Sequence, residues 1–166
     1  MSARTGRSVV ITVSDGVSAG TRADASGDAA ERILARSGLD VTARVSVPDE
    51  RDAISDAIRD AAEDAALVVT TGGTGLGPRD VTPEATRAVV ERDAPGLAEL
   101  MRAAGLAKTP MAALSRAIVG TRGHTLIVNL PGSTKGVEES LEALLPVLPH
   151  ALEVLAGHTE HGAPED

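Results

Sequence analysis

The sequence contains no cysteine and no Phe, Tyr or Trp. The absence of cysteine excludes disulfides, thiolate catalysis and zinc sites built on cysteine, and it agrees with a reducing cytoplasm. The absence of aromatic rings removes the platforms on which single-stranded nucleic-acid binders stack bases. A heterocyclic ligand would therefore have to lie against aliphatic side chains, main chain or an arginine plane.

Positive charge is also scarce, because 16 Lys and Arg residues stand against 24 Asp and Glu residues, a formal net charge of −8. Such an acidic chain is a poor partner for nucleic acid or an anionic membrane, and we expect neither. No run approaches the ~20 apolar residues of a membrane span, and the first residues do not resemble a signal peptide. The length of 166 residues predicts a single domain over 1–157, followed by a flexible polar tail at 158–166.

Short apolar runs alternate with helical patterns along the chain, which predicts an α/β fold. Strands are expected at 8–15, 40–48, 66–71, 115–120 and 124–130. The pattern of the second strand predicts that one of its faces is buried. Helices are expected at 26–38, 49–64, 95–107 and 134–157, and from Thr82 onward. Pro146 and Pro149 should bend the last helix or split it. Right-handed βαβ units then give a three-layer α/β/α arrangement around a mostly parallel sheet.

Acidic residues follow three of the predicted strands. Asp15, Asp49 and Asp80 come after the first, second and third strand, and the segment "NLPGSTKG" at 129–136 follows a later strand. In an open parallel sheet, ligands bind at the carboxyl ends of the strands. We therefore expect these residues to meet at one edge of the sheet.

The segment "GGTGLG" at 72–77 places four glycines in six residues. It is not a P-loop, because Gly77 is followed by Pro78 rather than by lysine and a hydroxyl residue. It is not a dinucleotide fingerprint either, because no glycine stands three residues after Gly75. Both familiar nucleotide motifs are therefore excluded by their spacing.

The glycines still favour anion binding over a tight turn alone, because backbone N–H groups without neighbouring Cβ atoms can approach an anion closely. A helix that begins near Thr82, with this threonine as its N-cap, would add partial positive charge. Asp49 by itself could be merely a helix N-cap. Asp49 and Asp80 together, at neighbouring strand ends, suggest a shared Mg²⁺, which often binds through one or two carboxylates plus substrate phosphates.

The turn "PGST" is surrounded by Asn129, Ser133 and Lys135. An amide, a hydroxyl and an ammonium group near a helix start suit an anion. The same residues equally fit a capped helix with Lys135 in solvent, and both interpretations stay open.

The segments "TTGGTGLGPRDVTPEAT" and "SRAIVGTRGHTLIVNLPGSTKG", with "VSD" at the end of the first strand, resemble the MogA/MoaB family of molybdenum cofactor biosynthesis proteins. The same domain forms the G domain of gephyrin-like proteins, and the resemblance runs from about Val9 to Leu155. It implies a three-layer α/β fold, a homotrimer and binding of molybdopterin. It also implies transfer of AMP from Mg-ATP to the terminal phosphate of molybdopterin, with release of pyrophosphate, and possible contact with a molybdate-inserting protein.

The resemblance assigns catalysis and Mg²⁺ binding to Asp49 and Asp80. It implies that substrate and nucleotide are bound by Asp15, Thr71, Gly72, Gly73, Thr74, Gly75, Asn129, Pro131, Gly132, Ser133 and Lys135. Two alternatives remain: a molybdopterin-binding module with little or no transfer activity, and a scaffold that keeps the glycines only for its fold.

Overall fold

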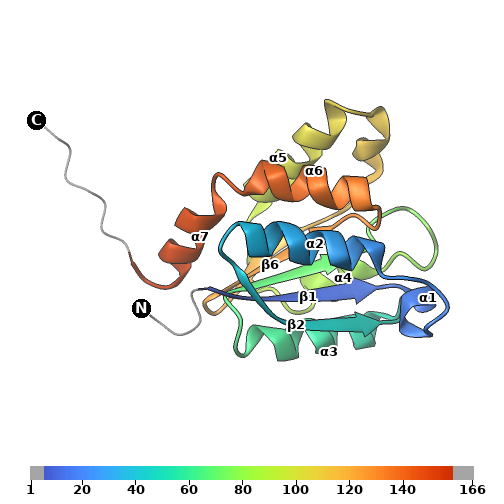
Figure 1. The fold of residues 1–166 in the computed structure, drawn as a ribbon, viewed down its shortest axis with the longest axis horizontal. Coiled ribbons are helices and arrows are strands. Elements are labelled where there is room, and N and C mark those ends of the chain that lie inside the picture. The colour runs from blue at the N-terminus through green and yellow to red at the C-terminus, as the bar shows by residue number, and fades with distance from the viewer. Residues whose placement is uncertain (1–5, 159–166) are drawn as a thin grey trace, which may run out of the picture.

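The structure, a computed structural model, describes residues 6–158 and shows a mixed six-stranded sheet between helices (Figure 1). The strands are β1 (Arg7–Val13), β2 (Asp40–Val47), β3 (Leu67–Thr71), β4 (Arg92–Asp93), β5 (Val119–Arg122) and β6 (Thr125–Leu130). The helices are α1 (Asp15–Ser18), α2 (Ala25–Arg36), α3 (Arg51–Ala62), α4 (Thr82–Arg87), α5 (Pro95–Leu106), α6 (Thr134–Leu144) and α7 (Leu148–Leu155), with a 3₁₀ turn η1 (Pro110–Leu114). Apart from His158, the predicted tail lies outside the described residues.

The strand order is β2-β1-β3-β6-β5-β4. The first four strands in this order run parallel, whereas β5 and β4 are antiparallel to their neighbours. The turn between β5 and β6 lies at Gly123, which has a φ of +54°. Because β1, β2, β3 and β6 run the same way, their carboxyl ends meet at one edge, where α1 also lies (Figure 1).

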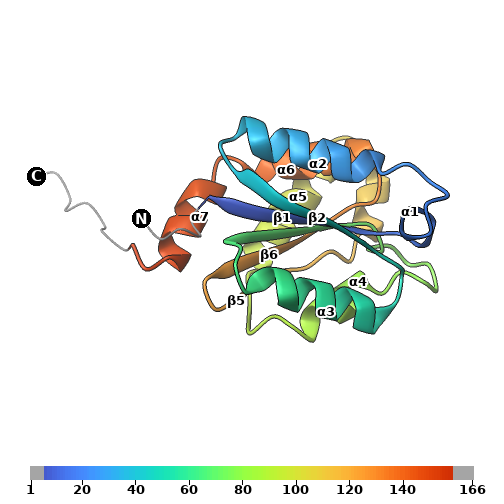
Figure 2. The same cartoon turned by 60° about the horizontal axis from the view of Figure 1, so that its bottom comes forward.

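Helices cover both faces of the sheet, which confirms the predicted three-layer α/β/α fold (Figure 2). One core packs α2, α5, α6 and α7 against the sheet, and a second core packs α3 and α4 against the other face. Side chains of β3 alternate between the two: Leu67 and Val69 belong to the first core and Val68 to the second. Burial on both faces explains why this strand is a continuous apolar run.

The strand at 40–48 exists as β2, but the prediction that one of its faces is buried was wrong. Along β2 only Val47 is buried, and Val45 keeps 39% of its surface exposed. The physical reason is position, since β2 is an edge strand and the helices pack over the central strands. The alternation of apolar and polar residues therefore predicted the strand correctly, but it did not predict that most of its side chains are exposed.

The prolines near the end of the chain split the last predicted helix, as expected. The helical stretch at 134–157 splits into α6 and α7, with Pro146 between them and Pro149 in the first turn of α7, where its missing N–H is tolerated. The segment at 115–120 is strand only from Val119, because residues 115–118 form an irregular connection after η1. Within residues 6–158, no helix has the length and hydropathy that crossing a bilayer requires.

Candidate functional site

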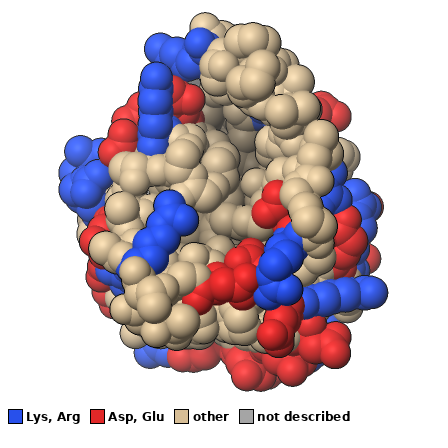
Figure 3. All heavy atoms as spheres, turned by 90° about the vertical axis from the view of Figure 1, so that its right-hand side faces the viewer, with Lys and Arg blue, Asp and Glu red and all other residues tan. Residues whose placement is uncertain are grey.

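Two cavities open at the carboxyl edge of the sheet, and every predicted site residue except Asp15 lines one or both of them. Figure 3 looks onto this side of the molecule, where acidic side chains gather next to a hollow. The first cavity, about 410 Å³, contains Asp49 and Asp80, and we refer to it as the acidic cavity. Its other lining residues are Thr12, Val13, Ser14, Val17, Arg22, Ala23, Ala25, Ser26, Thr71, Gly72, Gly73, Gly132, Ser133 and Thr134.

The second cavity, about 340 Å³, lies among α5, η1 and α6, and we refer to it as the apolar cavity. Of the predicted site residues it is lined by Thr74, Gly75, Asn129, Pro131, Ser133 and Lys135. Its remaining wall is largely aliphatic and includes Ala98, Met101, Met111, Ala112, Leu114 and Ala117. A heterocycle bound here would meet aliphatic and methionine side chains, as the lack of aromatic residues requires.

The glycine loop, residues 72–77, separates the two cavities; Gly72 and Thr74 are buried, whereas Leu76 and Gly77 are exposed. Gly72 and Gly73 have φ angles of +95° and +69°, which favour glycine. A Cβ on Gly72 would lie 2.4 Å from the carbonyl oxygen of Val13, and one on Gly73 would lie 2.3 Å from the hydroxyl oxygen of Thr82. The first two glycines are therefore required both by backbone conformation and by close packing.

The N–H groups of residues 73–76 donate no hydrogen bond to any residue of the described chain. Backbone N–H groups need a partner, from water, from a ligand or from the protein. Four consecutive donors without a protein acceptor therefore form an arrangement that can receive an anion.

Thr82 does not cap α4, so this prediction was wrong. The N-cap is Val81, and the Thr82 hydroxyl instead donates to the carbonyl oxygen of Gly72 at 2.8 Å. The reason is that Thr82 is fully buried beneath the loop and thus fastens the loop rather than the helix end. Asp80 closes the other end of the loop, because its Oδ2 accepts from the N–H of Gly77 at 2.9 Å.

Asp15 and Asp49 hold the ends of β1 and β2 together through a reciprocal pair of hydrogen bonds. The N–H of Asp15 donates to Asp49 Oδ2, and the N–H of Asp49 donates to Asp15 Oδ1, both at 3.0 Å. Arg79, from the segment after the glycine loop, donates from Nε and Nη2 to the Asp15 carboxylate at 2.7 and 2.9 Å. Asp49 does not cap α3, whose N-cap is Glu50 with no side-chain hydrogen bond. Asp49 is thus free of a helix-capping role.

The two carboxylates differ in their ionisation. Hydrogen bonds from the Arg79 side chain and from the N–H of Asp49 lower the pKa of Asp15. Burial raises the pKa of Asp49, and the negative charges of Asp15 and Asp80 add to this effect, whereas the hydrogen bond from the N–H of Asp15 and the charge of Arg79 oppose it. A raised pKa at a carboxylate in a cavity is typical of a functional position.

Across residues 6–158, no group of three or more His, Cys, Asp or Glu residues is placed to hold a metal ion. Asp49 and Asp80 nevertheless both line the acidic cavity. Each has one carboxylate oxygen, Oδ1, that accepts no hydrogen bond from the described residues. Two carboxylates with available oxygens fit an Mg²⁺ ion that completes its coordination with phosphate and water, rather than a resident metal in a protein cage.

Asn129 and the turn after β6 carry structural roles that the sequence left open. Asn129 is fully buried, and its Nδ2 donates to the hydroxyl oxygens of Thr70 and Thr86 at 3.1 and 2.9 Å. Ser133 caps α6 by accepting from the N–H of Gly136 at 3.0 Å. The Lys135 side chain is 80% exposed, although it also lines the apolar cavity. Contact of these residues with a ligand stays a prediction.

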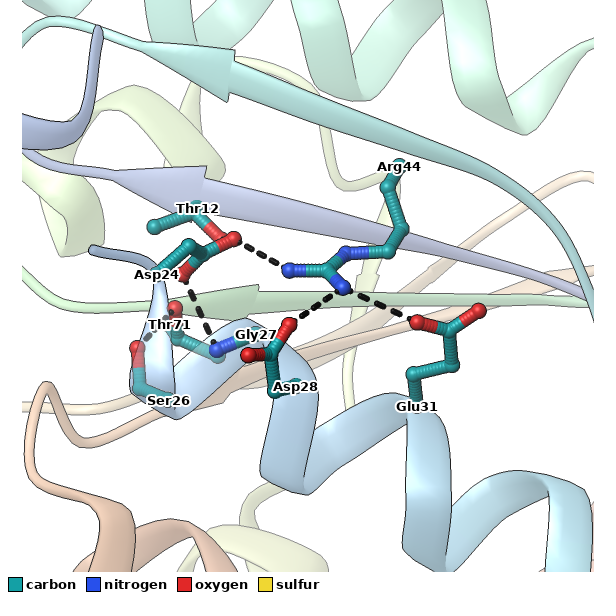
Figure 4. A network of polar contacts seen from close by, with 8 residues as sticks. All are labelled: Thr12, Asp24, Ser26, Gly27, Asp28, Glu31, Arg44 and Thr71. Carbon is teal, nitrogen blue, oxygen red and sulfur yellow. Dashed lines mark hydrogen bonds and ion pairs between the residues drawn. The ribbon is translucent and has the colours of Figure 1, made fainter. Parts of the chain in front are cut away.

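A polar network that the sequence did not reveal fixes the start of α2 beside the acidic cavity (Figure 4). Asp24 is the N-cap, and its carboxylate accepts from the N–H of Gly27 at 3.0 Å, from Thr12 Oγ1 at 2.8 Å and from Arg44 Nη2 at 2.6 Å. Ser26 shares a hydrogen bond of 3.0 Å with Thr71. An aspartate directly before the helical pattern was the available signal for the cap, whereas the contact with Arg44 on β2 has no local signature.

Comparison with known proteins finds similarity over most of the chain. Residues 9–150 match a family model described as "Probable molybdopterin binding domain". The molybdopterin adenylyltransferase of Helicobacter pylori strain J99 is 40% identical over 154 residues, which is 90% of this chain and 87% of that protein.

Two solved structures share both fold and sequence with the chain. The molybdopterin biosynthesis enzyme MoaB of Thermus thermophilus is 55% identical, with a TM-score of 0.86, over 91% of this chain and 96% of that one. The molybdopterin biosynthesis Mog protein of Mycobacterium ulcerans is 40% identical, also with a TM-score of 0.86, over 92% of this chain and 99% of that one. The chain therefore belongs to the MogA/MoaB family of molybdenum cofactor biosynthesis proteins.

Proposed function

We propose that this chain is a molybdopterin adenylyltransferase, which moves AMP from Mg-ATP onto the terminal phosphate of molybdopterin. The observation that carries the proposal is the pairing of the two cavities across one glycine loop. One cavity has carboxylates with available oxygens, the other has an aliphatic wall, and the loop between them has four N–H groups without a protein acceptor.

The character of each cavity suggests its occupant. The acidic cavity suits a triphosphate that carries Mg²⁺, because Asp49 and Asp80 would otherwise repel an anion. The apolar cavity suits a pterin ring, with Ser133 and Lys135 toward its phosphate. Volumes of about 410 and 340 Å³ lie within the usual range for small-molecule sites. The two phosphate ends would then meet at the glycine loop.

The reaction forms one P–O bond and breaks another. An oxygen of the molybdopterin phosphate attacks the α-phosphorus of ATP, and the bond from that phosphorus to the bridging oxygen breaks as pyrophosphate leaves with the electron pair. No covalent protein intermediate is needed, which agrees with a chain that has no cysteine. The protein contributes by positioning the two phosphates and by placing N–H donors where charge develops.

Asp49 and Asp80 would hold the Mg²⁺ that ATP brings, and the bound ion would neutralise charge on the triphosphate and on the leaving pyrophosphate. Asp15 would keep Asp49 in place through their reciprocal hydrogen bonds. Burial raises the pKa of Asp49, and the hydrogen bond from the N–H of Asp15 is the largest effect that opposes this rise.

The direct test is to incubate the protein with molybdopterin and Mg-ATP and to measure adenylylated product and pyrophosphate. We expect both products in equal amounts, and neither without Mg²⁺. Tight pterin binding with no product would identify a binding module instead. No pterin binding would leave only a scaffold role.

Three further expectations accompany the proposal. We expect a homotrimer, which light scattering coupled to size-exclusion chromatography would measure. We expect the adenylylated product to be consumed by a protein that inserts molybdate, which a pull-down with product-loaded protein would detect. We expect the reaction to take place in the cytoplasm, in agreement with the absence of cysteine.

A further inference from the structure

Both the side chain and the main chain of Arg116 donate hydrogen bonds to the glycine loop and the segment that follows it. Its guanidinium donates from Nε to the carbonyl oxygen of Gly75 at 2.8 Å and from Nη2 to the carbonyl oxygen of Asp80 at 2.7 Å. Its backbone N–H donates to the carbonyl oxygen of Thr74 at 2.8 Å. The residue lies between η1 and β5, far from the loop in sequence, so it links the two segments only through the fold.

All three acceptors are carbonyl oxygens, and this decides which way the loop's donors face. In a planar trans peptide, the carbonyl group of one residue and the N–H of the next point in opposite directions. Carbonyls that are turned toward Arg116 therefore turn the N–H groups of Gly75, Leu76 and Val81 away from it. None of these three N–H groups has a hydrogen-bond acceptor within the described chain.

Arginine suits this position better than lysine. The planar guanidinium presents several donors in a fixed fork, so one side chain can hold two carbonyl groups at a set separation. The third branch of the fork, Nη1, is paired with Glu84 in the first turn of α4. This pairing lowers the pKa of Glu84 and anchors the guanidinium to the helix that follows Asp80. About two thirds of the Arg116 side chain is shielded from solvent, since its exposed fraction is 34%.

We propose that Arg116 is a positioning residue for the nucleotide site: by holding the carbonyl groups of Thr74, Gly75 and Asp80, it keeps the N–H groups of the loop free to receive phosphate and fixes the main chain that carries the Asp80 carboxylate. It does not touch the substrate in this role. The proposal rests on the proposed function for the identity of the anion, but not for the restraint of the loop itself.

The test compares Arg116→Lys, which keeps the charge but loses the fork, with Arg122→Lys as the matched control. Arg122 lies on β5, and its Nη1 donates to a backbone carbonyl, that of Val89 at 3.1 Å, away from the loop. A milder third variant, Glu84→Gln, removes the anchor of the guanidinium and leaves Arg116 in place. Each protein is first checked for folding by circular dichroism and thermal melting.

Two readouts separate positioning from mere stability. The first is steady-state kinetics, in which Arg116→Lys should lower kcat/KM for Mg-ATP by about 10- to 100-fold, the effect of weakening charge-assisted hydrogen bonds. Most of this loss should be in kcat, because misplaced N–H donors stabilise the transition state less than correctly placed ones. The second is cleavage by trypsin after Arg79, whose side chain is 60% exposed. Cleavage should accelerate in Arg116→Lys, less in Glu84→Gln and not in Arg122→Lys.

The proposal is overturned if folded Arg116→Lys keeps both kcat/KM and the cleavage rate within about threefold of wild type, or if Arg122→Lys loses as much. Should Arg116→Lys fail to fold, Glu84→Gln decides on the same two readouts. Failure of the proposed function would look different, because wild-type protein would then make no adenylylated product while the trypsin comparison still reported on the loop.

Discussion

The amino and carboxyl ends of the parallel strands differ in how far their polar groups are hydrogen-bonded within the protein. At the amino ends, the hydroxyl of Thr125 donates to the carbonyl oxygens of Ala62 and Ala65 at 3.0 and 2.7 Å, and the N–H of Leu126 donates to the carbonyl oxygen of Ala66. At the carboxyl ends, the glycine loop leaves four N–H groups without a protein acceptor, and burial raises the pKa of Asp49. The polar groups named at the amino end are paired within the protein, whereas the four loop N–H groups have no acceptor in residues 6–158.

The difference shows where this fold places binding capacity. Charge and hydrogen-bonding groups that the protein does not satisfy cost stability, so they persist where a ligand uses them. Substitutions at either end should therefore have different consequences for activity and stability.

The largest effect is expected from Asp80→Asn at the carboxyl end. The amide keeps the shape of the side chain but loses the negative charge that would hold Mg²⁺. We expect adenylyl transfer to fall by about a thousandfold, because removal of one preorganised electrostatic group commonly costs that much in rate. Molybdopterin affinity should stay within about tenfold, or ~1.4 kcal/mol. The measurements are product formation and direct titration with the pterin. Normal turnover would remove Asp80 from the mechanism.

A second prediction compares two glycines that both have positive φ. Gly73→Ala would bring its Cβ to 2.3 Å from the Thr82 hydroxyl, whereas Gly38→Ala, at φ +80°, would meet nothing within 4 Å. We expect Gly38→Ala to cost about 1–2 kcal/mol of unfolding free energy from backbone strain alone. Gly73→Ala should cost more and also weaken Mg-ATP binding at least tenfold, or ~1.4 kcal/mol. Urea unfolding and calorimetric titration measure both. Equal nucleotide affinity in the two variants would contradict a role for the loop in binding.

At the opposite end, Thr125→Val should separate stability from activity. Valine has nearly the same shape but leaves the carbonyl oxygens of Ala62 and Ala65 without their hydroxyl donor. We expect a loss of about 1–3 kcal/mol in unfolding free energy, with kcat and KM unchanged at temperatures where the variant is folded. A kinetic defect without a stability defect would show that the two ends are not separate in function.

The smallest effect concerns pH. Nucleotide-borne Mg²⁺ needs the carboxylate form of Asp49, whose pKa is raised by burial and held down in part by Arg79. Arg79→Ala removes that opposing charge, so the pKa of Asp49 should rise further. Mg-ATP binding should then be lost at a higher pH than in wild type as the solution is acidified. Arg59→Ala, which breaks only a surface pair with Asp56, is the control. An unchanged pH midpoint in Arg79→Ala would contradict the electrostatic coupling.

Sequence patterns predicted the parts of this molecule that depend on neighbours along the chain. The strand at 66–71, the glycine loop and the break at Pro146 are each encoded locally, and resemblance to a known family assigned the acids after the strands. Sequence patterns gave wrong predictions where the burial or the role of a side chain depends on tertiary packing. Val45 alternates like a buried residue but lies on an edge strand, and Thr82 occupies a capping position but is turned beneath the loop.

The interactions that no pattern predicted join distant segments. Arg116 donates a hydrogen bond to Gly75, which lies 41 residues away in the sequence, and Arg44 donates one to Asp24, which lies 20 residues away. Each of these arginines looks like an ordinary surface cation in the sequence, because nothing local indicates which carbonyl or carboxylate the fold will bring beside it. The residues that could contact ligand were therefore partly predictable, whereas the residues that hold them in place were not.

We expect the N–H groups of residues 73–76 to receive the phosphates of a magnesium-bearing nucleotide. The most direct measurement is a titration of ¹⁵N-labelled protein with Mg-ATP, in which the amide resonances of both strand ends are followed together. We expect large shifts for the amides of Gly73, Thr74, Gly75 and Leu76, and unchanged resonances for Ala66 and Leu126. Saturable binding that left the four loop amides unshifted would contradict it.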